Sequence, residues 1–218
     1  MSGRLIVIEG LDGSGKATQA QQLFDYMAGG KTPVAKITFP DYESDSSALV
    51  KLYLRGELGS ADEVNAYAAS SFYSADRYIS YKKNWSKQWE AGYTIIADRY
   101  ATSNAVHQMA KLSPDEWEEY LDWLWDFEFA RMKLPKPSQV IYLDMPPELS
   151  RELMMKRYGG DKAKADIHET DFDYQQRCRE AAMFAAKRLG WTVLPCYNDN
   201  GLCTVEKMAE QIRAALNI

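Results

Sequence analysis

The feature that most constrains this chain is the glycine-rich segment at residues 10–18, Gly-Leu-Asp-Gly-Ser-Gly-Lys-Ala-Thr. An apolar run at residues 5–8 predicts a buried β-strand before it, and residues 19–27 predict a helix after it. Glycines let the backbone curl with its N–H groups pointing inward, and the helix that follows adds its positive dipole end. Lys16 adds a positive charge. This order is typical of a phosphate-binding loop, and an ordinary glycine turn is the alternative.

The residue after Lys16 departs from the usual form of such a loop. Ser or Thr normally stands there, and its hydroxyl holds Mg²⁺. Ala17 offers no side-chain oxygen, and Thr18 lies about 100° further round the helix. Either Thr18 substitutes, or other groups and water hold the metal ion, since Mg²⁺ keeps several waters in most sites.

Composition limits the classes of protein to consider. The 218 residues suffice for one large domain or two small ones, and a hydrophobic share of 46% permits a sizeable core. The net charge of −5, from 26 basic and 31 acidic residues, argues against general nucleic-acid binding. Cys178, Cys196 and Cys203 lack the spacing of a metal site and predict reduced thiols in the cytoplasm. We expect no signal peptide and no membrane span.

Strands and helices are expected to alternate along the chain. The expected strands are residues 5–8, 34–39, 93–97, 139–144 and 192–195. The expected helices are residues 16–28, 46–55, a long one from 60 or 62 to 90, 102–111, 113–133, 148–157, 172–189 and one opening at 204. Short apolar strands separated by helices predict an α/β fold in which a parallel sheet is covered on both faces.

Polar segments follow the first three strands. They are residues 12–16, 41–43 and 98–99. Because active sites of parallel sheets lie at the carboxyl ends of the strands, we expect all three to face one crevice. Asp98 is placed to bind a metal ion or its water, and Arg99 can take a phosphate with its planar fork. The alternative for this pair is a surface ion pair.

Tyr73 and Arg77 stand four residues apart in a predicted helix and therefore share a face. An aromatic ring beside a guanidinium suits a nucleobase, which stacks on the ring and accepts a hydrogen bond from the arginine. The alternative is a tyrosine at the core boundary beside a solvated arginine, and the spacing alone favours it. His107 and His168 have no partner that the sequence reveals, so neither receives a catalytic role.

The basic, glycine-hinged residues 156–164 have the character of a lid that closes over phosphates. A solvated charged loop explains this stretch equally well. We expect one domain over residues 1–218 with a lid at about 157–170.

Five motifs together resemble the thymidylate kinase family, which consists of P-loop nucleoside monophosphate kinases. They are the glycine loop, residues 39–41, residues 73–77, residues 98–100 with Ser103 and Gln108, and the passage from Asp166 and Glu169 to Phe172 and Arg177. The resemblance implies a P-loop kinase fold with a five-stranded parallel sheet, helices on both faces and a short lid. It also implies a cytoplasmic homodimer that transfers the γ-phosphoryl group of ATP to thymidine monophosphate with Mg²⁺.

The resemblance implies a role for each matching residue. ATP would contact the loop residues Gly10, Gly13, Ser14, Gly15, Lys16, Ala17 and Thr18. The acceptor would contact Asp12, Phe39, Asp41, Tyr42, Tyr73, Arg77, Arg99, Ser103 and Gln108. The catalytic residues would be Lys16, Asp12, Asp98, Arg99 and Arg157, with Asp98 and Asp12 as candidate metal ligands.

Within these sets, Tyr73 would stack on thymine, Arg77 would reach a thymine carbonyl, and Arg99 would hold the acceptor phosphate. The loop contains no arginine, as in those members of the family that use basic lid residues instead, which gives Arg157 its implied role on the transferring phosphoryl group.

Tyr42 is a second departure, because many members carry an arginine there that grips the acceptor phosphate. Its loss leaves Arg99 as the main candidate for that grip. The competing functions are a kinase for a deoxynucleoside or another pyrimidine monophosphate, and a regulator that binds ATP without transferring phosphate. The absence of a side-chain hydroxyl at position 17 is the feature that favours the second of these functions, the ATP-binding regulator.

Overall fold

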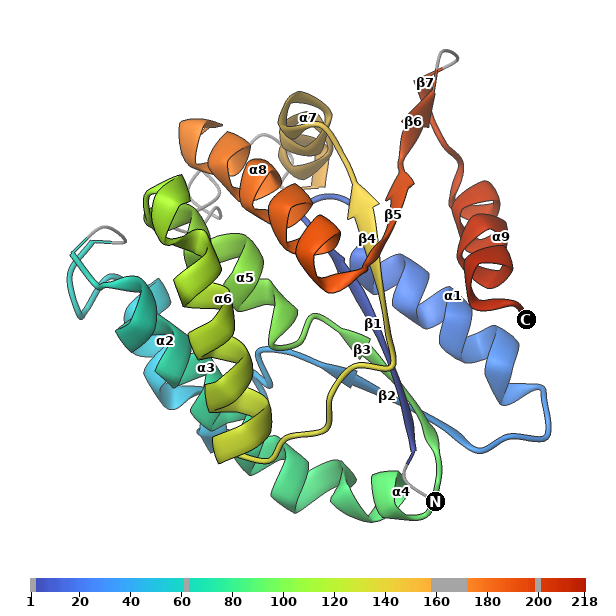
Figure 1. Cartoon of the computed structure of the whole chain (residues 1–218). Helices are drawn as coiled ribbons and strands as arrows, with labels where there is room; N and C mark the ends of the chain where they lie inside the picture. The colour runs from blue at the N-terminus through green and yellow to red at the C-terminus, as the bar shows by residue number, and fades with distance from the viewer. Residues whose placement is uncertain (1–2, 61–62, 158–171, 199–200) are drawn as a thin grey trace.

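The computed structural model describes residues 3–60, 63–157, 172–198 and 201–218 (Figure 1). Its central sheet contains five parallel strands in the order β2-β3-β1-β4-β5. The strands are β1 (Arg4–Gly10), β2 (Val34–Thr38), β3 (Thr94–Asp98), β4 (Gln139–Asp144) and β5 (Thr192–Pro195). The predicted α/β fold with a five-stranded parallel sheet is therefore confirmed.

Helices cover both faces of the sheet, as predicted. In Figure 1, α1 and α9 lie to the right of the sheet, whereas α2, α3, α5, α6 and α8 lie to the left. Side chains of β1 alternate between two apolar clusters: Leu5 and Val7 join one, and Ile6 and Ile8 join the other. The helices are α1 (Lys16–Ala28), α2 (Ala48–Leu54), α3 (Ala66–Ser80), α4 (Ser86–Glu90), α5 (Thr102–His107), α6 (Trp117–Trp125), α7 (Pro147–Arg157), α8 (Phe172–Leu189) and α9 (Val205–Leu216).

The predicted long helix from residue 60 or 62 to 90 is wrong in its start and in its continuity. The α3 helix begins after Asn65, whose side chain accepts a hydrogen bond from the Ala68 N–H at 2.9 Å. Ser60 instead opens a turn, in which its own N–H donates to the Glu63 carboxylate. The candidate cap at position 62 lies outside the described residues. A π-helical turn at Tyr81–Trp85 then separates α3 from α4.

Other predicted helices contain tighter or wider turns. The 3₁₀ turns are Asp45–Ser47, Met109–Lys111 and Pro114–Glu116, and a second π-helical segment is Asp126–Arg131. The sequence analysis also missed the short hairpin of β6 (Tyr197–Asn198) and β7 (Gly201–Leu202). The predicted lid lies outside the described residues apart from Arg157, the last residue of α7. Among the described helices, none is both long enough and apolar enough to cross a membrane.

The connections of the sheet place a crevice at the carboxyl end of β1. The chain leaves β1 towards β2 on one edge of the sheet and leaves β4 towards β5 on the other edge. In open α/β sheets, ligands bind at such a reversal of direction. The glycine loop between β1 and α1 lies at this position.

Candidate active site

A cavity of about 670 Å³ opens at the carboxyl ends of β1, β2 and β3. Loop residues of the predicted site that line it are Asp12, Gly13, Gly15, Lys16, Ala17 and Thr18. Residues of the predicted acceptor and catalytic sets that line it from other segments are Phe39, Tyr42, Tyr73, Arg77, Asp98, Arg99, Ser103 and Gln108. The three polar segments expected to share one crevice thus each contribute to its wall.

Four residues of the predicted site do not belong to this lining. Gly10 and Ser14 lie behind the loop, where an added Cβ at Gly10 would stand 2.6 Å from Ser14 Oγ and 2.9 Å from the Leu143 carbonyl oxygen. The Asp41 N–H donates to the Asp76 carboxylate at 2.8 Å, and the Asp41 carboxylate accepts from Asn84. Arg157 is the fourth of these residues, and its side chain lies outside the described part of the structure.

The loop has the backbone conformation that anion binding requires. Gly13 and Gly15 adopt φ values of 80° and 86°, a left-handed region that strains residues with a Cβ. A Cβ at Gly15 would meet no atom within 4 Å, so the backbone there faces open space at the start of α1. Lys16 folds over the loop and donates from Nζ to the Leu11 carbonyl oxygen at 2.7 Å.

The charged groups at the loop shift one another's pKa values. Burial, with the nearby Arg99 cation, lowers the pKa of Lys16 to about 8, against the opposing pull of Asp12, Glu9 and Asp98. Burial alone would raise the pKa of Asp12, but Arg99 and Lys16 outweigh burial and hold it well below its usual value. At neutral pH the loop therefore presents an ionised Asp12 between two cations.

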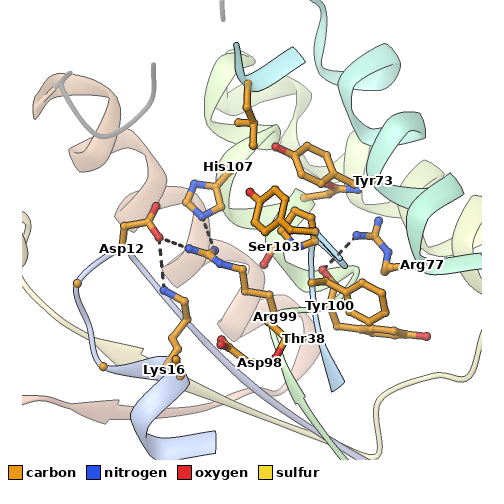
Figure 2. A pocket seen from close by; sticks show the side chains of 18 of the residues that line it. Asp12, Lys16, Thr38, Tyr73, Arg77, Asp98, Arg99, Tyr100, Ser103 and His107 are labelled. Atoms are coloured by element: carbon orange, nitrogen blue, oxygen red, sulfur yellow. Dashed lines mark hydrogen bonds and ion pairs between the residues drawn. The ribbon is translucent and has the colours of Figure 1, made fainter. Parts of the chain in front are cut away.

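Arg99 lies at the centre of the cavity between the loop and the opposite wall (Figure 2). Its φ of 66° turns the chain sharply at the end of β3, where its N–H donates to the Ile8 carbonyl oxygen. Its guanidinium donates to Asp12 and lies 3.7 Å from Glu9 Oε1. The alternative of a surface ion pair for Asp98 and Arg99 is wrong, because both line the cavity and the partners of Arg99 belong to β1 and the loop.

Arg77 is buried, which overturns the alternative of a solvated arginine. Its side chain is 1% exposed and forms an ion pair with Glu128, Nε donating to Oε2 at 3.2 Å and Nη2 to Oε1. Ser74 Oγ also donates to Glu128 at 2.6 Å. Nη1 contacts the Tyr100 carbonyl oxygen at 3.5 Å. Because Glu128 occupies Nε and Nη2, Nη1 is the nitrogen least strongly held by the protein.

Tyr73 contributes an aromatic wall to the cavity on the side of Arg77 (Figure 2). Its ring meets Tyr53 edge to face, with centroids 6.3 Å apart. The neighbouring Gln108 is 1% exposed, and its Oε1 atom has no hydrogen-bond partner within the described residues. A buried acceptor of this kind favours a ligand that brings a donor.

Sequence analysis missed two charged partners and one histidine. Glu9 is fully buried at the end of β1 and accepts from Thr102 Oγ1 at 2.8 Å and Ser103 Oγ at 2.7 Å. His107 lines the cavity and lies 2.9 Å from Arg99 through Nε2. The signal for His107 was available, since it stands four residues after Ser103 on the same predicted helix. The third missed residue is Glu128. It lies too far along the chain for any local pattern to link it to Arg77.

Candidate metal ligands are few. Asp98 is 8% exposed, lines the cavity, and its carboxylate forms no hydrogen bond or ion pair with the described residues. Asp12 is already engaged by Arg99 and Lys16. Throughout the described ranges, no group of three or more His, Cys, Asp or Glu side chains is placed to hold a metal ion. A magnesium ion here would depend largely on phosphate oxygens and water.

The parallel sheet and the glycine loop after β1 define a protein of the P-loop nucleotide-binding class. Comparison with known proteins specifies it further. Residues 8–201 match the family model described as thymidylate kinase, so the chain belongs to the thymidylate kinase family. It is therefore a nucleoside monophosphate kinase, a phosphotransferase.

Curated relatives and a solved structure agree with this assignment. The chain is 32% identical over 204 residues to thymidylate kinase from Mycobacterium tuberculosis, covering 90% of this chain and 94% of the relative. It is 33% identical over 162 residues to thymidylate kinase from Caenorhabditis elegans, covering 69% of this chain and 66% of the relative. The structure of thymidylate kinase from Candida albicans shares the fold, with a TM-score of 0.68 at 23% identity over 99% of this chain and 92% of that one.

The lowered pKa of Lys16 predicts an alkaline limit to kinase activity. As pH rises through about 8, Lys16 loses its proton in the free enzyme, and kcat/KM for ATP should fall. Bound phosphates favour the charged lysine, so kcat should fall only at higher pH. The measurement is a pH profile of both parameters for the wild type and for Lys16→Arg, which keeps its charge. An identical alkaline limb in Lys16→Arg would assign the titration to another group.

Proposed function

We propose that this protein transfers the γ-phosphoryl group of ATP to thymidine monophosphate, giving thymidine diphosphate and ADP. The observation that carries the proposal is that one cavity joins the glycine loop, Arg99 and the wall of Tyr73 and Arg77. A phosphate donor on the loop and a nucleotide acceptor on the wall would meet at Arg99. Membership of the thymidylate kinase family supports this choice of substrates.

On the donor side, the loop would cradle the ATP phosphates with its backbone N–H groups, from Gly10 to Thr18. The open space at Gly15, at the start of α1, fits that role. Lys16 would hold the β- and γ-phosphates by exchanging the Leu11 carbonyl oxygen for a phosphate oxygen. Arg157 would stabilise the transferring group, a role that rests on the family resemblance.

On the acceptor side, Arg99 would hold the phosphate of the monophosphate, and Tyr73 would stack on thymine. Arg77 would donate from Nη1 to a thymine carbonyl, while Glu128 holds its other two nitrogens. The orphaned Gln108 Oε1 would accept from the N–H of the base. Ser103, Phe39 and Tyr42 would shape the base and sugar pocket, and Asp41 precedes Tyr42 in the sequence.

These residues bind, orient and stabilise charge, which is most of what phosphoryl transfer asks of a protein. Mg²⁺ would neutralise phosphate charge in the bound state, with Asp98 and Asp12 as the candidate carboxylates. Asp98, whose carboxylate forms no hydrogen bond with the described residues, fits that role better than Asp12, which Arg99 and Lys16 already engage.

Several finer features remain proposals. A single domain over residues 1–218 with a lid at about 157–170, a homodimer and a cytoplasmic location rest on the family resemblance and on composition. Size-exclusion chromatography with light scattering tests the dimer. Phosphorylation of a deoxynucleoside or of another pyrimidine monophosphate is the competing activity, supported by Tyr42 where the family often has an arginine.

The function is tested by ADP release over a panel of nucleosides and all common nucleoside monophosphates. Thymidine monophosphate should give the highest kcat/KM, and Lys16→Ala should lower turnover by orders of magnitude because a preorganised charge is lost. Unchanged turnover in Lys16→Ala would contradict the phosphate role of the loop. ATP binding without turnover on any acceptor would favour a non-catalytic regulator instead.

Arg77→Lys tests base recognition while preserving the charge opposite Glu128. A lysine cannot hold the carboxylate with two nitrogens and present a third to the base, so KM for thymidine monophosphate should rise roughly 5- to 100-fold with KM for ATP nearly unchanged. Steady-state kinetics with each substrate varied measures both. Arg77→Ala is the wrong variant, since it leaves Glu128 buried without a partner. An equal rise of both KM values would indicate a packing defect.

Ala17→Thr tests how the metal ion is held. Because the new hydroxyl would add one ligand at an exposed position, the apparent Mg²⁺ affinity should improve or stay equal. Asp98→Asn should weaken it more than Thr18→Val does. A Mg²⁺ titration of turnover for the wild type and the three variants measures the order of their apparent Mg²⁺ affinities. Loss of metal dependence in Thr18→Val alone would show that Thr18 has taken the ligand role.

A further inference from the structure

Three groups from different segments surround the guanidinium of Arg99. Asp12 of the loop accepts from Nη2, and Glu9 of β1 lies 3.7 Å from Nη1. His107, at the end of α5, places Nε2 2.9 Å from Nη1 (Figure 2). Two of these groups are carboxylates and the third is an imidazole. The imidazole makes the shortest contact to Nη1.

The chemistry of this contact fixes the state of the histidine. A guanidinium nitrogen has only protons to donate, so Nε2 of His107 must be the acceptor. The imidazole is then neutral, with its proton on Nδ1. That nitrogen faces Cys178 Sγ at 3.7 Å, and burial raises the pKa of the Cys178 thiol well above its usual value. A protonated sulfur remains a weak acceptor, which suits Nδ1–H.

The α8 helix holds His107 from behind. Tyr174 Oη donates to the His107 carbonyl oxygen at 2.7 Å, and both Tyr174 and Cys178 are buried in the main apolar cluster. The helices α5 and α8 also pack directly on each other. The imidazole is therefore supported on one side by the core and presents Nε2 to the cavity on the other.

We propose that His107 is a positioning residue that holds Arg99, through this hydrogen bond, in the orientation that receives the acceptor phosphate. The inference rests on the proposed function, because Arg99 is taken to bind that phosphate. A carboxylate in the place of His107 would orient Arg99 equally well but would add a third negative charge beside it, after Asp12 and Glu9. A neutral acceptor fixes Nη1 without further opposing the binding of a phosphate dianion.

Two variants separate orientation from packing. His107→Leu fills a similar volume without an acceptor, whereas His107→Gln keeps an oxygen that can accept from Nη1. We expect His107→Leu to raise KM for thymidine monophosphate roughly 2- to 10-fold, as for one lost neutral hydrogen bond, with KM for ATP within about twofold. His107→Gln should stay close to the wild type. Thermal denaturation of each variant reports on folding.

A pH series gives a readout that does not need His107→Leu to fold. Among the described residues, the titratable and charged groups that face the imidazole include Arg99, with Asp12 and Glu9 beyond it, and the buried Tyr174 and Cys178 of α8. Protonation of Nε2 would place two donors opposite each other, so KM for thymidine monophosphate should rise more steeply towards acidic pH in the wild type than in His107→Gln. Ionisation of the substrate phosphate affects both proteins equally and cancels in their ratio.

The outcomes separate this inference from the proposed function. If the wild type phosphorylates thymidine monophosphate but both His107 variants match it in KM and in pH profile, the positioning role is overturned and the function stands. A parallel rise of both KM values in both variants also overturns it, in favour of packing. If the wild type shows no turnover of thymidine monophosphate, the proposed function and the inference fail together.

Discussion

The cavity depends on how one guanidinium is held between segments that are distant in the sequence. Arg99 follows β3, yet its partners come from β1, the glycine loop and α5. Its positive φ directs the side chain away from the strand and over the loop. Because Asp12 and Lys16 belong to the same cluster of charges, Arg99 acts together with burial in shifting the pKa values of both loop residues. The glycine loop and the end of β3 are thus coupled electrostatically through this side chain.

The sequence allowed the fold to be predicted because its determinants are local. Each strand is a short apolar run, and the glycine loop combines three glycines with a lysine in a fixed order. Such patterns need no knowledge of distant contacts. The parallel sheet then follows from the alternation of strands and helices, and the position of the cavity follows from the carboxyl ends of the strands. Lys16, Asp98 and Arg99 were proposed as site residues on this basis, whereas Phe39, Ser103 and Gln108 were proposed from the family resemblance.

What escaped prediction depends on contacts between distant residues or on competition between similar local signals. Arg77 looked like a solvated residue because its partner, Glu128, lies 51 residues away on a different helix. Ser60 and Asn65 are both suitable helix caps, and only the turn that Ser60 forms with Glu63 decides between them. His107 shares a face of the predicted helix with Ser103, but its contact with Arg99 appears only once β3 and α5 are folded together.

The balance of charge in the cavity indicates what catalysis still requires. Arg77 is neutralised by Glu128, so among the described residues that line the cavity the cations left for phosphates are Lys16 and Arg99, beside Glu9, Asp12 and Asp98. Two bound nucleotides would add several negative charges to a site that is not positive in sum. Electrostatic stabilisation of phosphoryl transfer therefore needs further cations. In the proposed reaction, Mg²⁺ would supply part of that positive charge whether or not residue 17 carries a hydroxyl ligand, and the basic segment 156–164 of the sequence is the second candidate source.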